Sequence, residues 1–217
     1  MINEAIRPTV LSVKIISNVS PELSKKLELG PNHKSLGLIT ADVDDVTYTA
    51  LDEATKAAQV DVVYAKSMYA GSANASTKLA GEVIGIIAGP SPAEVRSGLN
   101  ACLDFMENGS HFTSANEDNS IVYYAYTVSR TGSYLSKVAG VKEGEAIAYL
   151  VAPPLEAMYG LDAALKAADV TMKEFFSPPT ETNFGGGLLS GTQSACRAAC
   201  DAFSEAVKSV ANEPRSF

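Results

Sequence analysis

Carboxylates are concentrated in one short run of this chain, Asp42-Val43-Asp44-Asp45, which follows an apolar stretch and precedes a helical pattern. One interpretation is local. Asp44 or Asp45 caps the first amides of the helix, and the other carboxylate interacts favourably with the helix macrodipole. The second interpretation is an electronegative site for a small cation. Both interpretations stay open on these residues alone.

A cation site needs more than one turn of a helix. Glu82 can supply a carboxylate from a second side, and Phe112 an aromatic face that attracts a cation. A small primary ammonium alcohol would suit such a group, because its ammonium has three donors and one charge. Its hydroxyl end needs neutral partners, and the best candidates lie on one later loop: Thr182, Asn183 and Phe184.

The histidines and cysteines form no catalytic set. His33 and His111 are far apart and neither stands in a metal-ligand pattern, so both are interpreted as surface or loop residues, although His111 beside Phe112 could line an opening. Cys196 and Cys200 are spaced i, i+4 and could share a metal on one helix face. They lie on the apolar stripe of that helix, which favours a place in the core.

A run of three glycines, residues 185–187, resembles a phosphate cradle only superficially. A P-loop needs Lys-Ser/Thr and a helix start after the glycines, and Leu188-Leu189 follows instead. No nucleophile–base pair is visible either. We therefore expect no enzyme activity, no catalytic residue, no bound metal and no cofactor.

Composition excludes several classes of partner. The net charge is −8 and no Lys/Arg run exists, so nucleic acid lacks the basic surface it requires. The apolar runs are far too short to span a bilayer, and the first residues show no signal pattern. Three cysteines without zinc-like spacing fit a reducing cytosol.

The element that positions the acidic run is written twice. Residues 51–60 read LDEATKAAQV and residues 161–170 read LDAALKAADV, an offset of 110 with seven of ten positions shared. Upstream, Leu23-Ser24-Lys25 falls on Leu135-Ser136-Lys137 at an offset of 112, and downstream Arg96 falls on Arg197 at an offset of 101. Such self-similarity indicates two copies of one structural unit. We assign residues 1–115 and 116–217 to the two domains.

The copies differ at the acidic run. The second copy has Ala152-Pro153-Pro154-Leu155 in the corresponding place, and prolines start a helix without carboxylates. The first copy therefore carries more charge than a helix start requires. This surplus is the reason for considering a cation site.

Each copy is expected to contain about four strands and two main helices in an α+β layer pair. Apolar and β-branched runs predict the strands, at residues 9–16, 36–40, 60–65, 82–88, 121–128, 146–152, 170–176 and 188–190. Ser-Pro pairs predict N-capped helices from Ser20 and Ser91, with a capping box to Glu94 at the second. The strand at 60–65 is expected to be buried, and residues 66–80 and 177–187 are expected to be loops.

This order resembles the shell domain of bacterial microcompartments. The usual opening of that domain is matched by Ser35-Leu36-Gly37-Leu38-Ile39, and its helix by the doubled decamer. Its Arg-containing turn is similar to Val128-Ser129-Arg130-Thr131, which here precedes the second copy instead of following it. Each copy therefore resembles a circularly permuted, ferredoxin-like shell domain with an antiparallel sheet flanked by helices. The ethanolamine-utilisation branch of the tandem permuted shell proteins is the most similar.

The resemblance implies a homotrimer in which six lobes form a disc that tiles with other shell proteins around enzymes inside the cytoplasm. Lys56 and Lys166 match the lysine that such domains carry at the disc edge. The loops at 66–80 and 177–187 match the position that faces a central pore thought to open and close. The implied ligand is ethanolamine, at the acidic and neutral groups named above.

A different class of function stays open on the residues. A soluble trimeric sensor with ferredoxin-like lobes would have the same architecture. The paired edge lysines favour the shell protein. Extended two-dimensional sheets would separate the two hypotheses.

Overall fold

The computed structural model describes residues 1–68 and 77–216. They divide into two compact units. Unit 2 comprises Arg7–Ser110 and Gly132–Leu135, and unit 1 comprises Met1–Ile6, His111–Thr131 and Ser136–Phe217. The domain boundary at residues 115 and 116 stays a prediction from the repeat.

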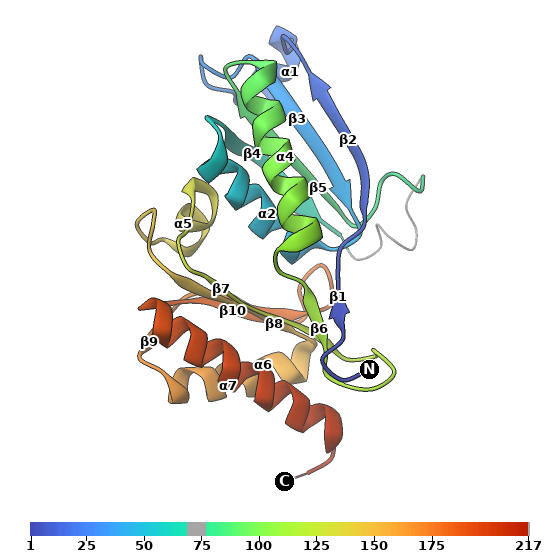
Figure 1. Ribbon diagram of the computed structural model, residues 1–217, viewed down its shortest axis with the longest axis vertical. Coiled ribbons are helices and arrows are strands. Elements are labelled where there is room, and N and C mark those ends of the chain that lie inside the picture. The colour runs from blue at the N-terminus through green and yellow to red at the C-terminus, as the bar shows by residue number, and fades with distance from the viewer. Residues whose placement is uncertain (69–76, 217) are drawn as a thin grey trace. The chain divides into compact units, whose positions relative to one another are not determined.

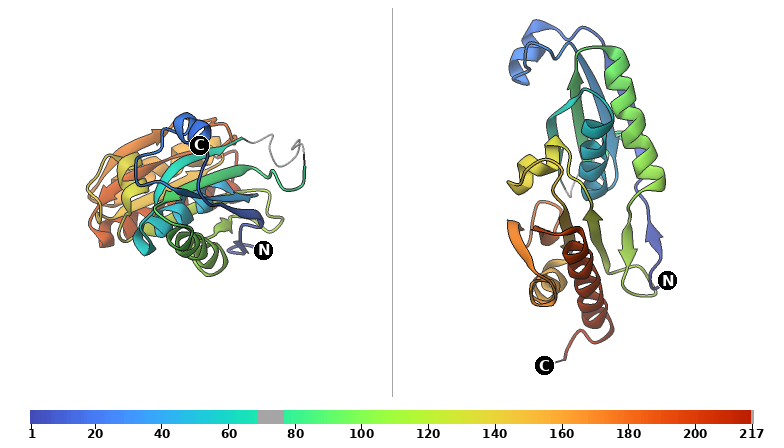
Figure 2. Two further views of the ribbon diagram at one scale, coloured as in Figure 1. Left: turned by 90° about the horizontal axis from the view of Figure 1, so that it is seen from above. Right: turned by 60° about the vertical axis from the view of Figure 1, so that its left-hand side comes forward.

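Unit 2 contains a four-stranded antiparallel sheet with the order β2-β3-β5-β4 (Figure 1). Helices α2 and α4 lie side by side on one face of this sheet (Figure 2). Its elements are β2 (Val10–Ile16), α1 (Pro21–Lys26), β3 (Ser35–Ala41), α2 (Asp44–Ala57), β4 (Asp61–Ser67), β5 (Val83–Gly89) and α4 (Pro92–Asn108).

Unit 1 repeats this arrangement and adds two short strands, in the order β1-β6-β7-β8-β10-β9. Helices α6 and α7 lie side by side against its sheet (Figures 1 and 2). The elements of the second copy and the added strands are β1 (Ala5–Ile6), β6 (Phe112–Ser114), β7 (Val122–Val128), α5 (Ser133–Ala139), β8 (Ile147–Ala152), α6 (Pro154–Ala167), β9 (Val170–Phe176), β10 (Gly185–Gly191) and α7 (Gln193–Asn212). Because β7-β8-β10-β9 matches β2-β3-β5-β4, the predicted α+β tandem duplication is confirmed.

Each unit has its own core between sheet and helices. In unit 2 this core includes Ile39, Leu51, Ile87, Leu99 and Met106. In unit 1 it includes Leu150, Leu161, Leu189, Phe203 and Val207. The stripe predicted on the last helix is confirmed, because Cys196 and Cys200 are both buried in the unit 1 core.

The predicted starts of α1 and α4 are confirmed. The hydroxyl of Ser91 accepts a hydrogen bond from the amide of Glu94 at 3.3 Å, and that of Ser20 accepts one from Leu23 at 3.4 Å. The Glu94 carboxylate, however, accepts from the amide of Gln59 at 2.8 Å. The side chain that should have closed the capping box therefore ties α4 to the segment that follows α2.

The prediction that Asp44 or Asp45 caps α2 is wrong. The N-cap residue is Val43, which is extended and makes no side-chain capping bond. Asp44 and Asp45 are instead the first two residues of the helix, where their charges face the positive end of its macrodipole. The third acid of the run, Asp42, accepts from the amide of Thr9 at 2.6 Å.

Two strand predictions also need correction. The strand predicted as buried at 60–65 is β4, which lies next to β5 at the edge of the four-stranded sheet and consists of exposed and half-buried residues. Gly185, Gly186 and Gly187, expected in a loop, belong to β10 between β8 and β9. A Cβ atom on Gly187 would lie 2.6 Å from the carbonyl oxygen of Glu174, and one on Gly186 would collide with that of Leu150. The glycines allow close strand approach.

Candidate functional site

The acidic pair at the start of α2 is buried. Asp44 is 9% exposed and Asp45 8% exposed. The Asp44 carboxylate accepts from the amide of Asp45 at 2.9 Å and also shares side-chain hydrogen bonds with Ser67 and Asp45. These carboxylates are therefore held within the protein, unlike those of an ordinary solvated helix start.

Burial raises the pKa of Asp44, and hydrogen bonds from Ser67 and Asp45 oppose this shift. The pKa values of the two tyrosines beside the pair are raised as well. Burial raises the pKa of Tyr48, and burial with the nearby charges of Asp45 and Asp52 raises the pKa of Tyr134 to about 12. The acidic pair is thus surrounded by neutral hydroxyl groups, which can donate hydrogen bonds to a carboxylate.

Three residues that were not predicted from the sequence also belong to this group: Ser67, Tyr48 and Tyr134. The Tyr48 and Tyr134 rings lie 6.4 Å apart between centroids. Tyr48 could have been found, because it stands one helical turn after Asp44 on the same face. Ser67 ends β4 and Tyr134 belongs to the second copy, so no local pattern connects either residue with Asp44.

Glu82 lies just before β5 at the same end of the unit 2 sheet. Its amide donates to the carbonyl oxygen of Ala41 at 2.9 Å, and its own carbonyl oxygen accepts from Met68 at 3.0 Å. Ala41 ends β3 and Ser67, which bonds to Asp44, ends β4. The backbone pairing therefore brings Glu82 to the end of the sheet where α2 begins.

The neutral half of the predicted site belongs to unit 1. Phe112 stacks on Tyr124 at 5.3 Å and meets Phe184 edge-on at 5.9 Å, so two of the predicted aromatic residues are in contact. Thr182 is 7% exposed and its hydroxyl lies 3.2 Å from that of Thr180. Asn183 has a φ of 62°, which Asn tolerates better than most residues. This group is a tight turn packed on an aromatic cluster.

The two predicted edge lysines differ in their surroundings. Lys166 is exposed over 75% of its side chain and pairs with Asp162 at 2.6 Å. The Lys56 side chain is only 14% exposed, because it lies against Glu53 and 3.6 Å from the buried Asp52. Lys166 thus presents its ammonium to a neighbouring molecule more openly than Lys56 does.

His33 is tied into unit 2. Its Nδ1 accepts from the amide of Gly30 at 3.1 Å, which leaves the proton on Nε2, 2.8 Å from a carboxylate oxygen of Asp61. This bonding makes His33 a structural link at the edge strand β4.

His111, the other histidine, directly precedes Phe112 and β6 in unit 1.

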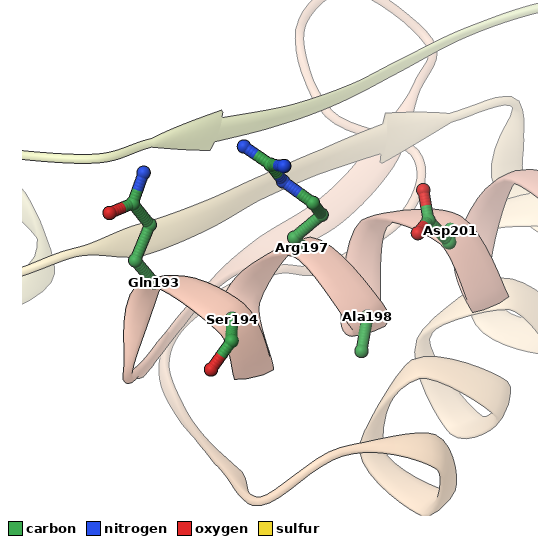
Figure 3. Close-up of a pocket in the computed structure, with 5 residues that line it drawn as sticks. All are labelled: Gln193, Ser194, Arg197, Ala198 and Asp201. Carbon is green, nitrogen blue, oxygen red and sulfur yellow. The ribbon is translucent and has the colours of Figure 1, made fainter.

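A shallow groove of about 450 Å³ lies along the start of α7 in unit 1. Figure 3 shows Gln193 and Arg197 pointing to one side of this helix and Ser194 and Ala198 to the other. The Gln193 amide donates to the hydroxyl of Ser129 at 2.9 Å. Asp201 also lines the groove. Its negative charge makes the groove less favourable for an anion than Arg197 alone would make it. None of the predicted ligand residues is part of this groove.

Within residues 1–68 and 77–216, no group of three or more His, Cys, Asp or Glu residues is arranged to hold a metal ion. Over the same residues, no helix is both long and apolar enough to cross a membrane.

Comparison with known proteins identifies the fold. The family described as the BMC domain matches residues 35–117. The chain is 80% identical over 217 residues to bacterial microcompartment shell protein EutL of Clostridium perfringens, covering 100% of both chains. It is 63% identical to the solved structure of ethanolamine utilization protein EutL from Leptotrichia buccalis, with a TM-score of 0.98 and 100% of both chains covered.

A more distant structure shares the fold alone. The trimeric bacterial microcompartment shell protein PduB is 20% identical with a TM-score of 0.74, over 94% of this chain and 89% of that one. The full-length identity to EutL confirms the predicted class, a structural shell protein and not an enzyme. The chain belongs to the EutL family of bacterial microcompartment shell proteins.

Proposed function

We propose that three copies of this chain form a tile in the shell of a microcompartment that handles ethanolamine, next to other shell proteins. The observation that carries this proposal is the identity of 80% to EutL over the whole chain. The duplication supports the number of copies, because two equivalent lobes per chain close a six-lobed ring when three chains meet. The name of the fold relative PduB describes that protein as trimeric.

The acidic pair is the proposed binding site for the ammonium group of ethanolamine. Asp44 and Asp45 are adjacent, mostly buried and close to neutral hydroxyl groups, and Glu82 lies at the same end of the sheet. An ammonium gains most from such carboxylates where water is largely excluded. Phe112, Thr182, Asn183 and Phe184 remain the predicted partners of the carbon stem and hydroxyl.

Affinity at this site should be modest. A ligand with so few non-hydrogen atoms has little contact energy available, and a shell that passes a molecule must also release it. A central pore that opens and closes also stays a prediction, since residues 69–76 of the loop at 66–80 lie outside the described residues.

Electron microscopy of the concentrated protein together with native mass spectrometry tests the proposed function. We expect trimers in dilute solution and extended two-dimensional sheets at high concentration. A stable monomer or dimer would contradict the trimeric tile. Trimers that never form sheets, alone or with other shell proteins, would favour the soluble sensor.

A further inference from the structure

Helices α2 and α6 correspond residue for residue. Each has 14 residues, and the offset of 110 that aligns the repeated decamers also aligns both of their ends. The strands β2 and β7 and the starts of α1 and α5 correspond at an offset of 112. Contacts made by α2 can therefore be compared with the same positions on α6.

In unit 2, α2 binds the segment Gly132–Leu135 at the start of α5. The carboxylate of Asp52 accepts from the amide of Gly132 at 2.7 Å and from that of Leu135 at 2.8 Å. The hydroxyl of Thr55 accepts from the amide of Ser133 at 3.1 Å. Asp52 is fully buried by this contact, and Leu135 is 1% exposed.

The matching face of α6 is exposed and apolar. Leu155, Met158, Tyr159 and Leu165 are exposed by 61%, 47%, 57% and 38%. Two of their counterparts on α2, Asp45 and Thr49, are buried, and a third, Tyr48, packs against Tyr134. The carboxylate of Asp52 is retained as Asp162, which is exposed over 64% of its side chain.

The exchange at one pair of positions indicates what covers this face. Thr55 corresponds to Leu165, so the accepting hydroxyl is lost on α6. Ser133 corresponds to Pro21 at the start of α1, so the donating amide is lost as well. If only the threonine had changed to leucine, the amide opposite it would be covered without an acceptor, which is costly. The paired change keeps a contact between these two segments satisfied and makes it apolar.

We propose that the exposed face of α6 binds residues 20–23 of a second copy of this chain. In this contact Leu165 packs on Pro21, and Leu23, which is 38% exposed, takes the place of the buried Leu135. Glu22 stands where Tyr134 does, so the tyrosine pair of unit 2 is not reproduced. The inference rests on the proposed trimer and names the surfaces that join its chains.

This arrangement also rejects wrong pairings. If α6 received the start of α5 from another copy, the amide of Ser133 would meet Leu165 and lose its acceptor. If α2 received the start of α1, the hydroxyl of Thr55 would still donate to the carbonyl oxygen of Asp52 but would lose the hydrogen bond that it accepts, because Pro21 has no amide hydrogen. Penalties of this kind separate correct from incorrect partners. The contact within a chain is therefore polar at this position, and the contact between chains is apolar.

Cysteine cross-linking tests the contact. Pro21→Cys and Leu165→Cys are combined in the full chain and treated with a short bismaleimide. The native cysteines should not react, because all three are buried and burial raises the pKa of Cys102 and Cys200 to about 12. We expect covalent dimers and trimers on a denaturing gel. The combination of Ser133→Cys with Leu165→Cys should give none. Thr55→Cys with Ser133→Cys should be linked within one chain, so that the product carries the mass of one chain plus one cross-linker and runs as a monomer.

The outcomes distinguish this inference from the proposed function. If the double variant Pro21→Cys, Leu165→Cys is trimeric by native mass spectrometry but forms no cross-links between chains, the contact is overturned and the trimer stands. If the wild-type chain forms no oligomer by native mass spectrometry, the trimer itself is overturned.

A matched pair of variants adds a second measurement. Leu165→Glu should weaken trimer formation at least tenfold, because it places a charge in the apolar contact. Ala167→Glu, at an exposed position in the same helical turn, should leave trimer formation unchanged. Equal effects of the two substitutions would also overturn the contact.

Discussion

Asp44 and Asp45 are almost as buried as the apolar side chains near them. A buried carboxylate is costly unless hydrogen bonds or an opposite charge compensate for the lost water. Asp44 has the amide of Asp45 and the hydroxyl of Ser67, yet the pKa of Asp44 is still raised by burial. Both carboxylates lie in the first turn of α2, where the helix macrodipole favours negative charge. A cation bound to this pair stays a prediction.

Asp45→Asn tests this role. The substitution preserves size and hydrogen-bonding capacity but removes the charge, so we expect the fold to be unchanged. Ethanolamine binding, measured by calorimetry at millimolar ligand, should weaken by roughly tenfold, since a hydrogen bond to a charged group contributes about 1.5–3 kcal/mol. Asp104→Asn, at an exposed position on α4, is the control. Equal binding by the wild type and Asp45→Asn would exclude Asp45 as a ligand group.

Asp44→Asn tests the electrostatic cost of the pair. A carboxyl group whose pKa is raised in the folded state stabilises folding below its ordinary value of 3.8, and this stabilisation is lost as pH rises through the folded pKa. Asn stays neutral at every pH and still offers an acceptor to the amide of Asp45. The variant should therefore melt at a higher temperature than the wild type at neutral pH, and the difference should shrink as pH falls.

Asp118→Asn is the control for this pH series. The pKa of Asp118 is lowered by hydrogen bonds from Ser120, so its charged form is the favoured one and the variant should gain no stability at neutral pH. Thermal melts of the three proteins between acid and neutral pH give the comparison. A melting temperature of Asp44→Asn at or below that of the wild type throughout would show that the charge of Asp44 is compensated.

Among the elements, β10 depends most on the absence of side chains. It lies between β8 and β9, and a Cβ atom on Gly186 would collide with the carbonyl oxygen of Leu150. Gly186→Ala should reduce the free energy of unfolding by on the order of 3 kcal/mol, because the neighbouring strand must move. Denaturant unfolding measures this loss. Gly30→Ala, whose Cβ would meet nothing closer than 3.7 Å, should cost far less.

Helices α2 and α6 show how one element can acquire two roles after duplication. Both keep the Asp and Lys of the repeated decamer, yet Asp52 is buried by backbone amides and Asp162 is exposed. Leu51 and Ala54 of α2 and their counterparts Leu161 and Ala164 of α6 all lie in the core of their unit. Their outer faces differ, because α2 is covered within its own chain.

At the scale of the whole molecule, Lys166 and Lys56 should contribute differently to tiling. Lys166→Ala removes an exposed ammonium whose pairing with Asp162 contributes at most about 0.5 kcal/mol. We expect this variant to keep the melting temperature of the wild type and to form no two-dimensional sheets when it is examined by electron microscopy. Sheets indistinguishable from those of the wild type would remove Lys166 from the tile edge.

Lys56→Ala should instead lower stability. Its ammonium lies 3.6 Å from the carboxylate of the buried Asp52, which no longer has a nearby positive charge in the variant. We expect a loss on the order of 1 kcal/mol in the free energy of unfolding. A melting temperature equal to that of the wild type would show that Lys56 does not stabilise the fold.

The sequence by itself determined the duplication, the α+β class, the helices of both copies and the family. These features depend on local signals, such as the apolar spacing of α7 or the Ser-Pro start of α4, which hold in any fold that contains them. The acidic run could also be singled out from the sequence, because it carries more charge than a helix start needs. Tyr48 was not predicted, although it stands one helical turn after Asp44 and could have been found from the helical period.

Only the tertiary structure decided which residues meet from distant parts of the chain. Ser67 reaches Asp44, Glu94 turns to Gln59, and Asp52 binds the start of α5, because sheet pairing and helix packing bring these segments together. The glycines of β10 look like a loop in sequence, since their composition does not reveal that two strands press on them. Secondary-structure propensity depends on the residues of one segment. The burial of that segment and its distance from neighbouring strands depend on other segments that the fold brings beside it.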